Sequence, residues 1–528
     1  MKFKYIIVVI AGLAICSSSC KKNLVETPYS SLSSSEVFNS ETGLKEATLG
    51  IYQNYTNAYF TTWYRFCLNE SGHQYSTAAF YGDAFCTDQN GFVGTPQSMV
   101  AGEADQIWAQ DYAGVARANT VIGNATKAVS DTSIVNKYIA EARFLRAFAY
   151  FDLVRLFGGV PIIDQQITSL SQTNLIYGKR ASVQDTYNFI VADLLYAASE
   201  LPDTRSATDA GRVTAGTAKA LLGKVYLTMA GKPLGQTAYY QKAVDVLKQV
   251  VGGAGEAKYN FGLLNNIADV YSITNKKNAE VVLAFSFFYS SSNTSANLNP
   301  FFSLPNGYTS GDEQTFFGLT YAFYQLYEGK DKRRDLTMIS RYKTVHTGNN
   351  ANEGDSIIYN PTRLRYIDTN NHAIFASQAI NSGIAFGKYD RTARPAGSPP
   401  WGYSTDLIMM RFSDVVLCLA EAEIETGNLS DALLLINRVR ARAGASPYTD
   451  ADNMEARVRL ERKLELMGDY TTVFDIRRWG TLQNEIAGMS ASQVFSGVKG
   501  TYNTKYELYP IPQAEINTNP NLTQNPGY

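Results

Sequence analysis

Apolar residues recur at steps of three and four along several stretches of the chain, a spacing that predicts amphipathic helices. The clearest stretch is 134–157, which is followed by a pair of glycines and a proline. Its apolar residues share one helical face, namely Tyr138, Ala142, Leu145, Ala149, Leu153 and Leu156. Alanines between them let a neighbouring helix approach closely, so we expect a helix that is packed on several sides.

The same stretch carries three arginines, Arg143, Arg146 and Arg155, among five aromatic residues. Arginines mixed with aromatic rings occur on nucleic-acid-binding surfaces and also in tightly packed scaffold helices. The chain has 47 Lys and Arg against 48 Asp and Glu, so it lacks the basic excess of a nucleic-acid binder. Glu141 and Asp152 lie at helical offsets from the arginines. We therefore interpret the stretch as a buried, ion-paired scaffold helix and expect no nucleic-acid partner.

Other amphipathic stretches can be matched in pairs. The sequence RFSDVVLCLAEAEIETGNLSDALLLINRVRARAG, residues 411–444, is a helix–turn–helix of 34 residues, the period of the tetratricopeptide repeat. The expected pairs are 44–57 with 107–124, 134–157 with 182–199, 214–231 with 238–251, and 411–426 with 430–443. Since stacked pairs bury each other's apolar faces, the pattern predicts a mainly α fold on a tetratricopeptide-like scaffold of about four helix pairs.

The chain changes character over about 253–400, which is rich in Gly, Asn, Ser, Pro and aromatic residues. Within it, EVVLAFSFFYS (280–290) reads as short strand, and most of the remainder reads as long loops. Helical spacing returns over 456–479, and residues 480–528 are irregular again. We expect a loop-rich, ligand-binding part with small strands to pack on the helical scaffold, within a single domain over 36–528.

The N-terminus reads MKFKYIIVVIAGLAICSSSC, with two lysines, an apolar run of 11 residues and small residues before Cys20. This order is typical of a signal peptide, and the run is too short to span a bilayer comfortably. It resembles a bacterial lipoprotein signal over 1–19, after which Cys20 would become the lipidated N-terminus. Residues 20–35 are polar and rich in serine, as expected of a tether. An ordinary secretory signal is the alternative interpretation.

Five segments together resemble one known family. They are the lipoprotein leader, AEARFLRAFAYFDLVRLFGGVPII, the 411–444 helix pair, ERKLELMGDYTTVFDIRRWG and the ending YPIPQAEINTNPNLTQNPGY. In this order they are similar to the SusD/RagB family of outer-membrane nutrient-binding lipoproteins of Bacteroidota. The resemblance implies the SusD-like fold, in which an irregular ligand-binding part packs on helix pairs. Gly468, Asp469 and Tyr470 replace the Phe-Glu-Gly that the family commonly has, so we expect different local packing there.

The resemblance also implies a function and a partner. Family members capture an oligomeric nutrient, here expected to be a glycan, and deliver it to a SusC-like TonB-dependent transporter barrel. By this analogy, lipid on Cys20 holds the protein at the outer membrane, facing the cell exterior. We expect binding without bond cleavage and without a cofactor. Two alternatives stay open: peptide uptake by a member of the same family, and a tetratricopeptide adaptor that binds a protein segment.

Aromatic residues are concentrated in two regions, 52–92 and 285–327. Tyr and Trp rings pack on the C–H faces of sugars and hydrogen-bond hydroxyls at their edges. We predict ligand contact by Trp63, Tyr75, Tyr81, Tyr289, Tyr308 and Trp401, with Asp83 and Asn90 as neighbours that bind hydroxyls. Each ring could instead belong to the core, and each polar residue could serve a turn.

The sequence offers few residues for catalysis or metal binding. Its three histidines are His73, His346 and His372, and no two have metal-ligand spacing. It contains neither a nucleophile elbow nor a phosphate-binding loop. We therefore expect a non-catalytic protein without a metal. Cys67 and Cys86 could form a disulfide in an oxidising compartment, or both could be buried thiols.

Overall fold

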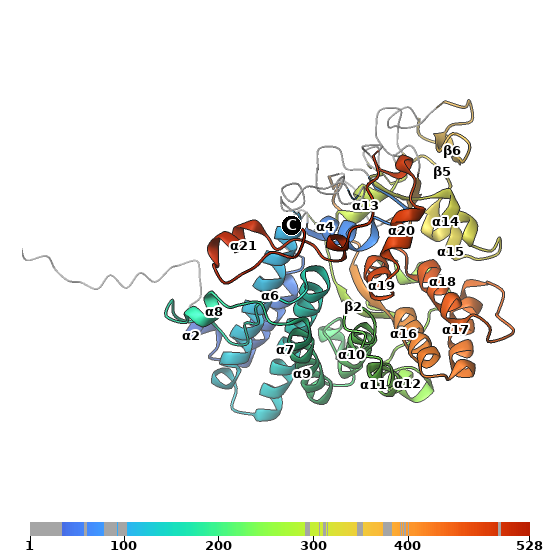
Figure 1. Cartoon of the computed structure of the whole chain (residues 1–528). Coiled ribbons are helices and arrows are strands. Elements are labelled where there is room, and N and C mark those ends of the chain that lie inside the picture. The colour runs from blue at the N-terminus through green and yellow to red at the C-terminus, as the bar shows by residue number, and fades with distance from the viewer. Residues whose placement is uncertain are drawn as a thin grey trace, which may run out of the picture.

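Figure 1 shows the computed structural model of the chain. The structure describes residues 34–56, 61–78, 92, 103–290, 296–305, 307–309, 313, 315–345, 352–372, 383–390, 392, 394, 398–399, 401–494 and 498–528. These residues form mainly helices, together with three small sheets. The leader and Cys20 lie outside the described residues.

The helical scaffold contains four pairs of packed helices. They are α3 (Glu41–Gln53) with α6 (Glu103–Ala128), α7 (Thr132–Phe157) with α9 (Val183–Glu200), α10 (Ala215–Ala230) with α11 (Ala238–Leu247), and α16 (Phe412–Glu425) with α17 (Leu429–Ala443). Successive pairs contact each other through α6 and α7, α9 and α10, and α11 and α16, an order that runs from left to right in Figure 1. Each pair thus covers an apolar face of the next, which confirms the predicted helix-pair scaffold.

Helix α7 is the buried scaffold helix that the sequence predicts. Arg155 pairs with Asp152 one turn earlier, as expected from their spacing. Arg146 instead reaches the neighbouring helix and lies 2.8 Å from Asp193. Glu141 pairs with two arginines of the segment that follows α9, not with arginines of its own helix. Most of these charges therefore join α7 to its neighbours.

Shorter helices connect the pairs and cover the sheets. They are α2 (Ser34–Val37), α4 (Thr61–Glu70), α8 (Thr173–Ile176), α12 (Gly253–Tyr259), α13 (Asn299–Ser303), α14 (Tyr321–Leu326), α15 (Arg333–Thr337), α18 (Met454–Leu466), α19 (Thr472–Arg478), α20 (Leu482–Gly488) and α21 (Gln513–Thr518). Single 3-10 turns occur at Ala207–Asp209, Ile267–Val270, Ala491–Gln493 and Thr504–Glu507. Within the described part of the chain, no helix combines the length and apolar character that crossing a membrane requires.

The helix predicted over 456–479 is interrupted between α18 and α19. Gly468 in this turn has a φ of +85°, and a Cβ there would lie 2.0 Å from a ring carbon of Phe386. The Glu70 carboxylate accepts hydrogen bonds from the backbone N–H groups of Gly468 (2.9 Å) and Thr471 (2.8 Å). Both partners come from distant parts of the chain, so the periodicity of 456–479 does not reveal the break.

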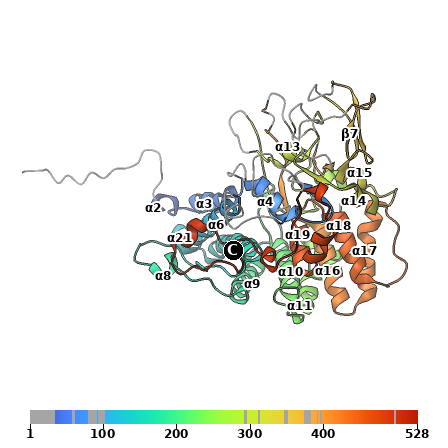
Figure 2. The same ribbon diagram turned by 45° about the horizontal axis from the view of Figure 1, so that its top comes forward.

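Three antiparallel sheets lie in the loop-rich part. Four strands pair in the order β1 (Ser76–Ala78), β3 (Phe317–Leu319), β8 (Ile384–Phe386) and β4 (Met338–Ile339). A second sheet contains β5 (Arg341–Lys343), β6 (Ser356–Asn360) and β7 (Arg365–Ile367), and a third pairs β2 (Val281–Phe285) with β9 (Leu407–Arg411). β2 lies within the strand predicted over 280–290. Figure 2 shows β7 with α13, α14 and α15 on the side away from α11.

One hydrophobic core joins the helical scaffold to the loop-rich part. Phe285, the last residue of β2, stacks on Tyr55 with a centroid distance of 4.3 Å. It also contacts Phe148 of α7 at 5.6 Å. The segment that leaves β2 is therefore held at its root by the scaffold.

Candidate functional site

A group of exposed aromatic residues lies where two chain segments leave the same small sheet. Phe285 at the end of β2 pairs with Leu407 at the start of β9. Because the two strands are antiparallel, residues 286–290 and 401–406 extend from the same end of the sheet. Segments more than a hundred residues apart in the sequence thus meet at one edge of the fold.

Polar contacts hold these two segments together. The Asp406 carboxylate accepts a hydrogen bond from Phe287 N (3.2 Å). Lys276 Nζ lies 2.7 Å from the same carboxylate and donates to the Phe287 carbonyl oxygen (2.6 Å). Tyr289 N donates to Ser404 Oγ (3.0 Å). The backbone of both segments is therefore fixed by groups other than the exposed rings.

Three aromatic side chains are presented by these segments. Phe288 is 65% exposed, Trp401 is 41% exposed and Tyr289 is half-buried. The Tyr289 ring lies close to Gly402, since a Cβ at that glycine would come within 3.1 Å of the ring. We call Phe288, Tyr289 and Trp401 the aromatic surface. Such rings can stack on the C–H faces of a ligand, and the Tyr and Trp edges can hydrogen-bond its hydroxyls.

A buried polar cluster supports the aromatic surface from residue 403 onward. The Tyr403 hydroxyl bonds Thr309 Oγ1 and the Glu313 carboxylate (3.3 Å). Glu313 also accepts from Thr309 N (2.8 Å). Burial raises the pKa of Tyr403, and the Glu313 charge adds to the rise, so the hydroxyl stays protonated and can donate. The cluster joins 307–309 to 401–406 and brings Tyr308, which is half-buried, to the same part of the fold.

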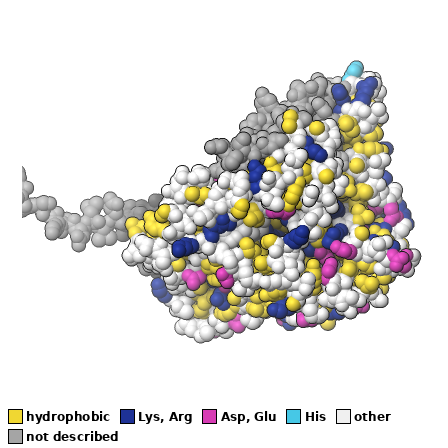
Figure 3. Space-filling model, in the orientation of Figure 1, with side chains coloured by type: hydrophobic (Ala, Val, Ile, Leu, Met, Phe, Trp, Pro, Cys, Tyr) yellow, Lys and Arg dark blue, Asp and Glu magenta, His cyan; other side chains and the backbone are white. Residues whose placement is uncertain are grey.

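Charges of both signs occur on the surface of the protein. On the face drawn in Figure 3, Lys and Arg side chains are interspersed with Asp and Glu, and hydrophobic side chains form small patches. Among the described residues, no three His, Cys, Asp or Glu side chains are grouped so that they could hold a metal ion. The aromatic surface therefore offers ring stacking and hydrogen bonding.

Two of the predicted ligand residues from the N-terminal region are described by the structure. Trp63 lies in helix α4, not in a loop, and is 1% exposed against Phe302 and Phe66. This corrects the expectation of an accessible Trp63 ring, because packing by distant Phe302 cannot be inferred from local composition. Tyr75 is half-buried, and its ring contacts His73 and Phe323, outside the aromatic surface.

The remaining predicted residues divide into two groups. Tyr81, Asp83 and Asn90 lie outside the described residues, as does Cys86, so their predicted roles and the Cys67–Cys86 disulfide stay predictions. Cys67 itself is buried in α4. Tyr289 and Trp401 lie on the two segments that carry the aromatic surface, and Tyr308 is joined to the same region through the Thr309 and Tyr403 contact, but their predicted ligand contacts stay predictions.

Phe288 is the exposed ring that the sequence reasoning missed. It has the largest exposed fraction of the three, and it follows a strand whose register is irregular over Val281–Ala284 and whose burial alternates only from Ala284 onward. Phe285 and Phe287 are buried, whereas Ser286 and Phe288 are exposed. Continuing the period-two pattern past the end of β2 would have identified it.

Comparisons with known proteins agree on one family. Residues 229–528 match the model of the SusD family, and residues 22–227 match a model described as starch-binding associating with outer membrane. SusD-like protein P2 of Formosa agariphila is 29% identical over 451 residues, which cover 81% of each chain. A crystal structure of a SusD homolog from Bacteroides thetaiotaomicron has a TM-score of 0.77 at 22% identity, covering 94% of this chain and 98% of that one. A structure named as a laminarin binding SusD-like protein has a TM-score of 0.72 at 24% identity, covering 93% and 100%.

Proposed function

The chain belongs to the SusD family, and from this membership we propose that it binds a glycan on the aromatic surface without cleaving it. The observation that carries the proposal is the exposure of Phe288 and Trp401 on two segments whose backbones are held by Asp406 and Ser404. Rings that are presented on a fixed backbone can stack on sugar faces with little ordering cost.

Further support comes from the names and descriptions of relatives. One structurally similar protein is named for binding laminarin. The model matched by residues 22–227 is described by starch binding. A nearly neutral chain with interspersed surface charges suits an uncharged polymer better than a highly charged one. Tyr308, Tyr81, Asp83 and Asn90 are retained as candidate contributors at the rim.

We further propose that the protein is an outer-membrane lipoprotein, anchored through Cys20, that faces the cell exterior and passes its ligand to a SusC-like TonB-dependent transporter. The leader motif and the description of the model matched by residues 22–227 support this placement. Several acyl chains on Cys20 would give stable anchoring. A Cys20→Ser variant should leave the membrane fraction and no longer co-purify with a transporter barrel.

The binding proposal is tested by calorimetry against neutral glycans, charged glycans and peptides. We expect saturable heat with a neutral glycan, and a loss of about tenfold in affinity for Trp401→Ala, since one stacked ring contributes about 0.5–1.5 kcal/mol. Tyr177→Ala is the matched control, because Tyr177 is 40% exposed against 41% for Trp401.

The outcomes separate the alternatives. Heat with peptides alone would move the protein to peptide uptake. Equal affinities for the Trp401 and Tyr177 variants would exclude the aromatic surface from the binding site. Binding of a protein segment to the helical scaffold, with no binding heat from any glycan, would favour the adaptor interpretation.

A further inference from the structure

A cavity separate from the aromatic surface lies where the helical scaffold meets helix α19 and the C-terminal segment. Its volume is about 460 Å³, and it is lined by the C-terminal ends of α7 and α10, the first turns of α9, helix α19 and residues 502–508. This volume is within the range of pockets for small-molecule ligands, roughly 300–1000 Å³. Val154, Val183, Phe474 and Leu508 give it apolar walls. It shares no lining residue with the aromatic surface.

Arg155 brings a charged group with free donors to this cavity. Its guanidinium lies between the rings of Phe151 (3.9 Å to the centroid) and Phe474 (3.7 Å). Nε donates to the Phe151 carbonyl oxygen (2.9 Å) and Nη2 to Asp152 (3.1 Å). No described residue accepts a hydrogen bond from Nη1, and the side chain is only 8% exposed. Asp152 is also shared with Arg65, so it compensates the Arg155 charge only in part.

Tyr187 adds a second donor without a partner. The residue is 2% exposed, lines the cavity and packs edge-on against Phe151. No described residue is hydrogen-bonded to its hydroxyl. Burial raises the pKa of Tyr187, with the nearby Arg155 charge opposing the rise, so the hydroxyl stays protonated. Because Tyr187 and Arg155 both line the cavity, an acceptor bound there could take hydrogen bonds from both.

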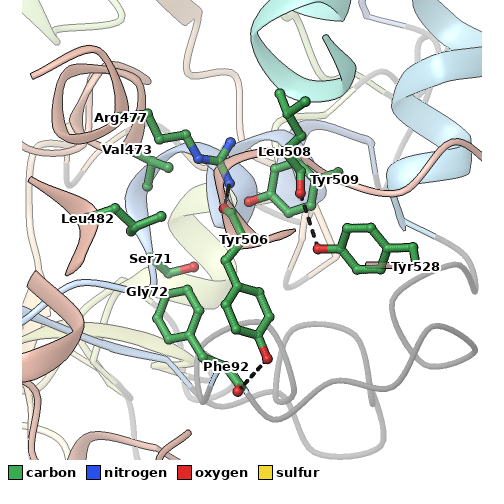
Figure 4. A pocket seen from close by; sticks show the side chains of 10 residues that line it. All are labelled: Ser71, Gly72, Phe92, Val473, Arg477, Leu482, Tyr506, Leu508, Tyr509 and Tyr528. Atoms are coloured by element: carbon green, nitrogen blue, oxygen red, sulfur yellow. Dashed lines mark hydrogen bonds between the residues drawn. The ribbon is translucent and has the colours of Figure 1, made fainter. Parts of the chain in front are cut away.

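The remaining charged groups on the wall leave a positive excess. Lys232 is exposed at the cavity, and no described carboxylate is in ion-pairing distance of it or of Arg477. Arg477 lines both this cavity and a neighbouring small pocket, and Figure 4 shows it in the small pocket with Nη2 donating to the Tyr506 carbonyl oxygen (3.1 Å). Arg478 is paired with two carboxylates. Glu507 is the single acidic side chain among the lining residues.

We propose that this cavity is a binding site for a small organic anion, a carboxylate carried by a compact apolar body. The carboxylate accepts hydrogen bonds from Arg155 Nη1 and the Tyr187 hydroxyl. The apolar body packs against Val183 and Phe474. An anion near a desolvated guanidinium gains a charge-assisted hydrogen bond that a neutral isostere lacks.

The first test uses acids of increasing size as probes: propionate, hexanoate, 3-phenylpropionate and 2-naphthoate, each against its primary amide. Calorimetry on the purified protein should show saturable binding, with the acids about tenfold tighter than the amides. Affinity should rise with the size of the apolar body. Absence of saturable binding by every acid, or equal affinities of acids and amides, would overturn the proposal.

Variants locate the site. Val183→Trp places an indole in the cavity and should weaken binding by at least about tenfold. Val191→Trp is the matched control, because Val191 is another half-buried valine of α9 that does not line the cavity. Tyr187→Phe removes the hydroxyl but preserves packing, and it should weaken acid binding by about fivefold. Arg155→Gln tests the other donor, and Tyr187→Phe replaces it if the Arg155 variant does not fold.

The proposal does not depend on the aromatic surface, and its failure is distinguishable from a failure of glycan binding. Both Trp variants should keep the glycan affinity of the unmodified protein. Equal loss of acid binding in Val183→Trp and Val191→Trp would contradict the assignment of the cavity.

Discussion

The packing around α16 to α19 buries charged side chains in ion pairs, whereas the aromatic surface exposes apolar rings to solvent. The two ends of strand β9 adjoin these two regions. Where β9 ends, Arg411 is fully buried and lies within 2.8 Å of Glu280 and Glu465 and 2.5 Å of Asp469. Where β9 begins, the rings of Phe288 and Trp401 face solvent and polar groups hold the backbone beneath them.

The difference shows how the fold separates rigidity from recognition. A buried charge tolerates little displacement, because losing a partner leaves it without hydration. The charges near Arg411 are also paired with Arg442, Arg333 and Lys388, which tie α15, α17, α18 and the segment after β8 to the same point. An exposed ring has no buried charge that must keep its partner, so the residue can be replaced without loss of the fold. The ion cluster therefore holds one end of strand β9, whose other end adjoins the segments that carry the exposed rings.

Breaking the ion cluster should give the largest effect. Arg411→Met leaves three carboxylates without their shared partner and should lower the free energy of unfolding by about 3–5 kcal/mol. Urea unfolding followed by circular dichroism measures the change. Arg334→Met is the control, because the Arg334 pair with Asp335 is exposed and should contribute at most about 1 kcal/mol. Similar losses for the two variants would refute the distinction between buried and exposed pairs.

A buried neutral group should give the next largest effect, through pH. His73 is 1% exposed, its Nδ1 accepts from Tyr75 N (3.2 Å), and burial lowers its pKa to about 4. The unfolded chain binds a proton near pH 6.5 that the folded chain excludes. The contribution of His73 to the free energy of unfolding should therefore fall by about 3 kcal/mol as the pH drops from 6.5 to 4.

A variant is needed to isolate the His73 effect. Burial raises the pKa of the neighbouring Glu70 to about 7, so its contribution to stability decreases as the pH rises from 4.5 to 7, the opposite sign. Because the Glu70 contribution is common to both proteins, the free energy of unfolding of the unmodified protein should fall by about 3 kcal/mol relative to that of His73→Asn between pH 6.5 and pH 4. The same pH dependence in both proteins would mean that His73 titrates normally.

The third effect sharpens the comparison at the aromatic surface without removing a ring. Gly402→Ala would place a Cβ 2.9 Å from Ser398 and 3.1 Å from the Tyr289 ring. The ring must shift, so glycan affinity should fall by about 1 kcal/mol, or roughly fivefold, with a smaller change in stability. Calorimetry and thermal unfolding measure the two quantities. A loss of stability that exceeds the loss of affinity would mean that Gly402 serves the packing of the fold and not the position of the Tyr289 ring.

The sequence predicts the two regions unequally well, for a physical reason. The helix pairs were predictable because a period of three to four residues is a local property, and α7 and α16 begin within two residues of their expected starts. The break before α19 depends on Glu70 and Phe386, and the burial of Trp63 depends on Phe302. These partners are distant in the sequence. Tyr289 and Trp401 were predicted as ligand contacts from composition, and that stays a prediction, whereas the proximity of their two segments follows from the register of β2 and β9.

The smallest effect tests whether exposure alone makes a ring part of the site. Phe288 is the most exposed member of the aromatic surface, but Phe lacks the polar edge of Tyr and Trp and covers less area than Trp. Phe288→Ala should therefore lower glycan affinity by about 0.5 kcal/mol, roughly twofold, and leave the free energy of unfolding unchanged. Leu170→Ala is a suitable control, since that side chain is 88% exposed at the other end of the scaffold. A loss for Phe288→Ala as large as that for Trp401→Ala would make the end of β2 the centre of the site, whereas no loss would confine stacking to the segment that leads into β9.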